Sequence, residues 1–175
     1  MDMVEAQRDL GRAYVGGGPG VLVSSLVWFA AALVETRGGT GPAFAALFLG
    51  GMLIFPTSMV ACRFLFRRER ESRANPLGRL ALESTIAMIG GLLAAWLFLP
   101  LRPDLVFPIA AIAVGTHYFV FRTIYGGIVY WLLGGLITVA GLLAIFDMVP
   151  IPGGTILAVG LIELIFGLFL TMRAK

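Results

Sequence analysis

Residues 154–172 read GTILAVGLIELIFGLFLTM, a run of nineteen residues in which Glu163 is the only charged side chain. About 20 helical residues are needed to cross the roughly 30 Å hydrocarbon core of a bilayer. This stretch is therefore long enough to span a membrane as a helix. An acidic side chain in the middle of such a span is costly, which makes Glu163 the first residue to examine for function.

The rest of the chain is similarly apolar. Of its 175 residues, 59% are hydrophobic and 13% are charged, whereas a typical soluble domain has about 45–50% and about 25%. A chain of this length cannot bury so much apolar surface in a water-soluble core. A soluble enzyme, a disordered tail and a disulfide scaffold are excluded, and we expect an all-α membrane protein.

Six apolar segments predict a bundle of six transmembrane helices in one domain, residues 16–175. The predicted spans cover about residues 20–36, 42–64, 76–99, 105–122, 126–147 and 153–172. Asn75 followed by Pro76 is typical of a helix start and places the beginning of the third span. In residues 1–15, Met3, Ala6 and Leu10 recur at helical spacing among charged residues. This pattern predicts a short amphipathic helix on the membrane surface.

The basic residues predict the orientation of the spans. Eleven of them, six in the connection between the second and third spans, fall on one side, and only Arg37 and Arg102 fall on the other. Because basic loops stay in the cytoplasm, both termini are expected there. An aromatic belt is expected at this interface, formed by Tyr14, Tyr118, Tyr125, Tyr130 and Trp131. The net charge of +3 is thus a topology signal, and no nucleic-acid partner is expected.

The arginine-rich connection is also a candidate contact for anionic lipid headgroups. The candidate residues are Arg67, Arg68, Arg70 and Arg73. The lipid bilayer is the expected partner.

Glu163 lies near the middle of the last span, on one helical face with Gly160 and Gly167. Small residues let another helix approach, so we expect the carboxyl group to face the bundle interior. Two interpretations stay open: a proton- or cation-binding site, or a protonated acid that holds helices together. In either case we hypothesise that Glu163 carries or shares a proton at neutral pH. A backbone carbonyl freed near Pro56 is one candidate partner.

Glu83 and His117 are the other candidates within the spans. Glu83 shares a face with Ala87 and Gly90, which predicts that it points into the bundle. Arg79, one turn earlier, offers an intrahelical ion pair as the alternative. The only histidine, His117, is either a neutral group hydrogen-bonded across helices or a pH switch. Both residues lie nearer the cytoplasm than Glu163, in the order that a proton path would need.

Signatures of known catalytic sites are missing from the sequence. It contains no GxSxG, HExxH, CxxC, P-loop or dinucleotide motif. One histidine and one cysteine are too few for a cluster of metal-ligating side chains. We therefore expect no enzymatic activity, no cofactor and no metal.

Short motifs along the chain carry a family resemblance. They are Ile54-Phe55-Pro56-Thr57-Ser58, Asn75-Pro76-Leu77-Gly78, His117-Tyr118-Phe119 and Tyr130-Trp131. With these motifs the chain resembles a family of small uncharacterised bacterial polytopic membrane proteins with a domain of unknown function. The resemblance implies a multi-pass protein of the bacterial inner membrane and implies no activity, substrate or catalytic residue.

Two functions remain open at this point. The first is a small transporter or channel-like protein that is linked to protons through Glu163. The second is a non-transporting scaffold or sensor subunit that packs against itself or a partner. A seam of small residues in the fifth span favours the second: Gly127, Gly134, Thr138 and Gly141. A homo-oligomer fits both functions, since six helices are few for a complete pathway.

Overall fold

The fold is helical throughout the residues that the structure describes. A computed structural model describes residues 1–148 and 154–174, without a strand among them. These residues form seven α-helices: α1 (Met3–Ala13), α2 (Gly18–Gly38), α3 (Thr40–Val60), α4 (Leu77–Leu97), α5 (Val106–Tyr125), α6 (Val129–Ile145) and α7 (Gly154–Arg173). Short turns precede α2 (η1, Val15–Gly17), follow α3 (η2, Ala61–Leu65) and precede α5 (η3, Pro103–Leu105). The predicted all-helical fold is confirmed.

Two parts of the predicted topology lie outside the described residues. These are residues 149–153, between the last two predicted spans, and the basic residue Lys175.

Within the described part of the chain, five helical stretches are long and apolar enough to cross a membrane. They cover Val15–Gly38, Thr40–Leu65, Leu77–Leu97, Pro103–Tyr125 and Gly154–Arg173. The sixth, α6, is apolar but has only 17 residues. It is shorter than the predicted span because Gly126 ends α5 in a left-handed conformation and α6 begins three residues later. These helices indicate a membrane protein with several spans. The sixth crossing stays a prediction.

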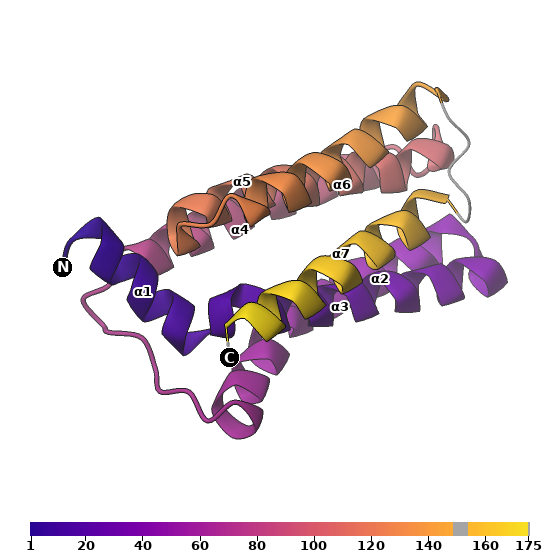
Figure 1. The fold of residues 1–175 in the computed structure, drawn as a ribbon. Coiled ribbons are helices and arrows are strands. Elements are labelled where there is room, and N and C mark those ends of the chain that lie inside the picture. The colour runs from indigo at the N-terminus through magenta and orange to yellow at the C-terminus, as the bar shows by residue number, and fades with distance from the viewer. Residues whose placement is uncertain (149–153, 175) are drawn as a thin grey trace.

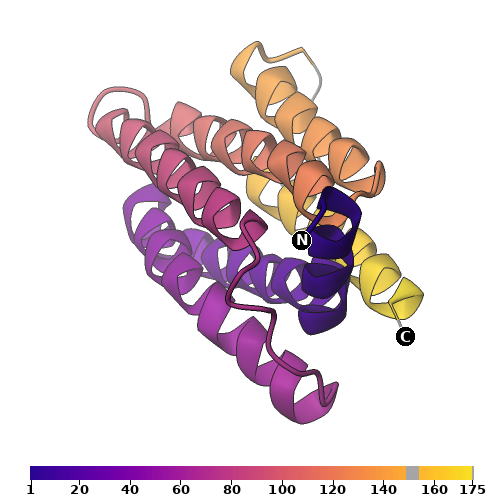
Figure 2. The ribbon, with the colours of Figure 1, turned by 90° about the vertical axis from the view of Figure 1, so that its left-hand side faces the viewer.

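The six long helices form two groups of three (Figure 1). In one group α2 packs between α3 and α7, and in the other α5 packs between α4 and α6. Contacts of α7 with α6 and α5 join the two groups. Helix α1, the end of α7 and segment 66–76 lie at one end of the molecule (Figures 1 and 2), which we call the basic end.

Small residues bring the helices of each group together. A Cβ atom on Gly134 of α6 would lie 2.5 Å from the Gly115 carbonyl oxygen of α5, and one on Gly141 would lie 2.6 Å from that of Pro108. The seam that suggested an external partner is therefore filled by α5 within the same chain. Its first predicted member, Gly127, lies before α6 begins.

The glycine face of α7 packs against α2 in the same way. A Cβ atom on Gly160 would lie 2.8 Å from the ring of Phe29, and one on Gly167 would lie 2.9 Å from Leu22. Larger side chains at these positions would push the two helices apart. The face that contains Glu163 is thus held inside the bundle.

Helix α1 forms as predicted, but protein covers its apolar face. Asp2 and Glu5 form a capping box at its start. Two of its buried side chains, Ala6 and Leu10, pack on Leu77 of α4 and Ile124 of α5. The apolar stripe that predicted a membrane-surface helix is therefore largely used against the ends of two other helices, and a position on the membrane surface stays a prediction.

Hydrogen bonds around Asp9 hold α1 to the start of α4. The Asp9 carboxylate accepts from the Ser72 backbone N–H at 2.8 Å and from the Asn75 side-chain amide at 3.0 Å. The Asn75 amide also donates to the Ala6 carbonyl at 2.9 Å, and its oxygen accepts from the Leu77 N–H at 3.0 Å. Helix α4 begins at Leu77, directly after Pro76, so the Asn75 side chain bonds the first residue of α4 and in addition fastens α1.

Protonation should release this attachment. Burial raises the pKa of Asp9, but hydrogen bonds from Asn75, Ser72 and Arg12 outweigh it, so the pKa is lowered from 3.8. The stability that Asp9 contributes is therefore present above that value and lost as pH falls through the lower folded-state pKa. Asp9→Ala should make the α1 amides exchange with deuterium about tenfold faster at neutral pH. Unchanged exchange, or an equal effect of Asp2→Asn at the exposed cap, would refute this role.

The topology can be tested with reporter fusions. Enzymes that are active only outside the cytoplasm should be active when fused after Arg37, Arg102 or Pro150, and fusions after Arg73 or Tyr125 should be inactive. A cytoplasmic signal after Pro150 combined with external signals at the first two sites would remove α6 as a crossing helix.

Candidate functional site

Glu163 is fully buried, with 0% of its surface exposed. Its Oε1 atom accepts a hydrogen bond of 2.8 Å from the hydroxyl group of Tyr118 on α5, which is also buried. This bond joins the two groups of helices. Among the described residues, the second oxygen, Oε2, is buried and has no hydrogen-bond partner.

The surroundings of Glu163 are otherwise uncharged. Ser24 of α2 lies beside both the carboxyl group and the Tyr118 hydroxyl. The ion pairs among the described residues lie near helix ends or in connecting segments, and they do not include a residue of α7. They are Arg12–Asp9, Arg12–Glu69, Arg63–Glu71 and Arg102–Asp104. The site thus offers the carboxyl group hydroxyl donors and no positive side chain. The partner expected near Pro56 of α3 is replaced by Tyr118 of α5.

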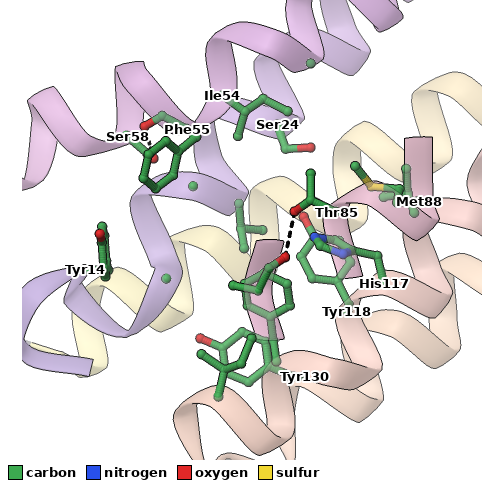
Figure 3. Close-up of a pocket in the computed structure, with 18 of the residues that line it drawn as sticks. Tyr14, Ser24, Ile54, Phe55, Ser58, Thr85, Met88, His117, Tyr118 and Tyr130 are labelled. Atoms are coloured by element: carbon green, nitrogen blue, oxygen red, sulfur yellow. Dashed lines mark hydrogen bonds between the residues drawn. The ribbon is translucent and has the colours of Figure 1, made fainter. Parts of the chain in front are cut away.

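A chamber of about 330 Å³ lies between the two groups of helices (Figure 3). Tyr118 and Ser24 form part of its wall, and Glu163 lies behind them outside the lining. From Leu10 and Glu71 at the basic end, the chamber extends to Trp28 in the middle of α2. The buried carboxyl group is therefore separated from the chamber by the two hydroxyl-bearing side chains that face it.

The chamber wall is mostly apolar. Its aromatic side chains are Tyr14, Trp28, Phe55, Tyr118, Phe121, Tyr125 and Tyr130. Two of its hydroxyl groups bond to their own helices: Ser58 donates to the Phe55 carbonyl and Thr85 to the Ala81 carbonyl, both at 2.9 Å. These groups are satisfied already, so the wall offers few polar contacts to an occupant.

His117 lines the same chamber from α5. Its Nδ1 atom lies 2.7 Å from the hydroxyl oxygen of Ser84 on α4, and its ring meets the Phe121 ring edge-on at 4.8 Å between centroids. It is therefore hydrogen-bonded across helices, and the choice between a neutral group and a pH switch stays a prediction.

The structure corrects the predicted direction of Glu83. Its side chain is exposed on the outer face of α4, together with Ala87 and Gly90. Helix α4 instead meets α5 through Gly91, where a Cβ atom would lie 2.7 Å from Ala113. The small residues around Glu83 therefore face outward, and the ion pairs of the described residues do not include one between Arg79 and Glu83. Of the three predicted proton-path residues, Glu163 and His117 approach one chamber and Glu83 lies outside it.

Two contributors to the site were missed by sequence reasoning. Tyr118 was placed in the interfacial aromatic belt, yet it is the buried partner of Glu163. Its position next to His117, one of the resemblance motifs, was the only signal available. The sequence offers no signal for Ser24, because a serine in an apolar span is common.

Polar groups lie at the basic end of the chamber. The Arg63 guanidinium lies 5.8 Å from the centroid of the Tyr14 ring, and its Nη2 atom is 3.7 Å from Glu71. Burial, and next the neighbouring Glu71 carboxylate, raise the pKa of Tyr14 to about 12. Tyr14 is therefore a neutral phenol at physiological pH.

The candidate lipid-contact arginines divide into two kinds. Arg67, Arg70 and Arg73 are exposed, whereas Arg68 is half-buried. The Nη2 atom of Arg68 donates to the Ala174 carbonyl at 3.1 Å. Arg68 thus fastens the end of α7, and the other three are available to the membrane surface.

Comparison with known protein families shows which family the chain belongs to. The sequence profile of a family of unknown function, DUF7010, matches residues 3–173. The chain belongs to this family. Searches of curated proteins and of solved structures found no match. Membership in DUF7010 confirms the resemblance to an uncharacterised family, and any function must be inferred from the site.

Substitutions at Glu163 should separate hydrogen bonding from titration. Glu163→Gln keeps an acceptor for Tyr118 and should leave thermal stability in detergent nearly unchanged. Glu163→Leu leaves the Tyr118 hydroxyl buried without its acceptor and should destabilise the protein by about 1–3 kcal/mol. Adding Tyr118→Phe should recover most of that loss, since both partners are then apolar. A fully stable Glu163→Leu variant would show that the bond contributes nothing.

Proposed function

We propose that this protein is a small proton-linked transporter of the bacterial inner membrane, with Glu163 as its proton-binding group. The observation that carries the proposal is the hydrogen bond from Tyr118, a residue of the chamber wall, to a fully buried carboxyl group. The transported molecule has an apolar body, because the chamber is lined mainly by aromatic and aliphatic side chains. The proposal includes no catalytic step and no cofactor.

A neutral carboxyl group fits the Glu163 site better than a carboxylate does. Removing an ion from water costs several kcal/mol unless hydrogen bonds or an opposite charge compensate. The titratable side chains nearby are Tyr118 from α5 and, beyond it, Tyr130 from α6. Helix α2 contributes Ser24. These hydroxyl groups bring no positive charge, so a proton on the carboxyl group is the available compensation.

Occupancy of the chamber can act on this proton through the hydroxyl groups of Tyr118 and Ser24. Tyr118 donates its one hydroxyl hydrogen to Glu163 and Ser24 lies beside it, so a ligand that accepts the Tyr118 hydrogen withdraws a donor from the Glu163 carboxyl group. Fewer donors favour the protonated form. Because such coupling is reciprocal, protonation of Glu163 in turn changes the affinity of the chamber for its ligand.

The two groups of helices supply the moving parts of this proposal. The Tyr118–Glu163 bond connects α5 of one group to α7 of the other. A change in the protonation of Glu163 therefore acts at the contact between the groups, where a change in relative position would open or close the chamber. In the predicted orientation, the basic end of the chamber faces the cytoplasm.

Proton movement can be measured in liposomes that contain the purified protein and the pH-sensitive dye pyranine. A potassium diffusion potential, negative inside, should acidify the interior faster than in empty liposomes. Glu163→Gln should reduce the rate to that of empty liposomes, because it cannot exchange a proton. Glu83→Gln is the matched control, since it makes the same change on the outer face of α4, and it should keep the wild-type rate.

Two results would contradict the proposal. One is a wild-type rate equal to that of empty liposomes. The other is an equal loss of rate in the Glu163→Gln and Glu83→Gln variants, which would show a general effect of charge.

A further inference from the structure

The packing and the exposure of α3 and α4 indicate that the chamber opens at its side, between these two helices. These two helices pack on α2 and α5 rather than on each other. Phe55 of α3 lines the chamber and is nevertheless 60% exposed. Around this opening the outward side chains are apolar, with Met52 on α3 and Ile86 on α4 each 61% exposed. In a helix pair that spans a membrane, such a surface faces the hydrocarbon chains of lipids.

The interior of the opening suits a hydrocarbon chain. The hydroxyl groups of Ser58 and Thr85, on the two sides of the opening, bond to backbone carbonyls of their own helices. The wall beside them consists of apolar groups such as Ile54 and Met88. A volume of about 330 Å³ is near the lower end of the range of about 300–1,000 Å³ for ligand sites. It suits one acyl chain better than a whole two-chain lipid.

The charge at the basic end indicates what kind of lipid fits. Arg67, Arg70 and Arg73 are exposed in the segment that crosses this end, and the ion pairs of the described residues do not include them. The nearby acidic side chains are already paired, Glu69 with Arg12 and Glu71 with Arg63. The surface beside the chamber mouth is therefore positive and complements an anionic headgroup.

We propose that the chamber holds one acyl chain of an anionic phospholipid, which enters from the bilayer between α3 and α4. The headgroup then lies on Arg67, Arg70 and Arg73, and the chain reaches Trp28 in the middle of the bundle. This proposal names the class of molecule that the proposed transporter takes up and rests on that function for its meaning. The binding itself is independent of proton movement and can be tested separately.

Quenching of Trp28 fluorescence by brominated lipids tests the proposal. Trp28 lines the chamber and is 1% exposed, whereas Trp96 and Trp131 are 53% and 50% exposed. In a Trp96→Phe/Trp131→Phe variant, Trp28 is the remaining tryptophan. In nanodiscs of unbrominated phosphatidylcholine, dibromostearoyl phosphatidylglycerol should quench it at about tenfold lower mole fraction than the brominated phosphatidylcholine does.

Two variants identify the chamber and the headgroup site. Gly51 lines the chamber, and a Cβ atom there would meet nothing within 4 Å. Gly51→Phe should fill the chamber and abolish quenching. Gly90→Phe is the matched control, because its Cβ atom also meets nothing but lies on the outer face of α4. In the Arg67→Ala/Arg70→Ala/Arg73→Ala variant, both brominated lipids should quench Trp28 equally.

A Trp28→Phe/Trp131→Phe variant keeps Trp96 as its remaining tryptophan and serves as the control. The proposal is overturned if the brominated lipids quench Trp96 in that variant and do not quench Trp28. Equal quenching by both lipids in the wild-type background would overturn the anionic headgroup. Quenching that survives Gly51→Phe would show that lipid reaches Trp28 by another route. If quenching is as expected and liposomes show no proton movement, the binding site stands and proton-linked transport fails. If liposomes show proton movement and Trp28 is not quenched, proton-linked transport stands and the lipid-binding proposal fails.

Discussion

The hydrogen bond between Tyr118 and Glu163 is the interaction on which the rest of this structure depends. It satisfies one oxygen of a fully buried carboxyl group near the middle of a long apolar helix, where an unpaired polar group is costly. Gly160 and Gly167 keep lipid away from that group by letting α2 pack closely on α7. The same bond connects the two groups of helices, so the polar chemistry of the bundle and its architecture share one contact.

Packing within and between the two groups differs in kind. Within a group, glycines bring backbones together, as at Gly134 and Gly141 between α6 and α5. Between the groups, rings such as Trp28 and Phe121 line a chamber. Asn75 and Asp9 fasten α1 across the basic end of that chamber. A tight frame with a loosely filled interior is what a binding site inside a membrane requires.

The sequence predicts the helices well because length and hydropathy are properties of each segment alone. It also predicts a buried Glu163, since a central carboxyl group has no other inexpensive position. It fails for Glu83, because helical periodicity shows which residues share a face and not which face meets protein. It misses Tyr118 for a related reason: a tyrosine near a span end is typical of an interfacial belt, and only the three-dimensional approach of α7 buries it. The apolar face of α1 was assigned to lipid because its protein partner, the ends of α4 and α5, is distant in sequence.

The central claim is that Glu163 holds a proton inside the bundle at neutral pH. Infrared spectroscopy tests it directly, because the carbonyl stretch of a protonated carboxyl group is distinct from the stretches of a carboxylate. In lipid at neutral pH, the difference spectrum between the wild-type protein and the Glu163→Gln variant should contain the protonated-carboxyl band and no carboxylate bands. Carboxylate bands in that difference spectrum, without the protonated band, would contradict the account.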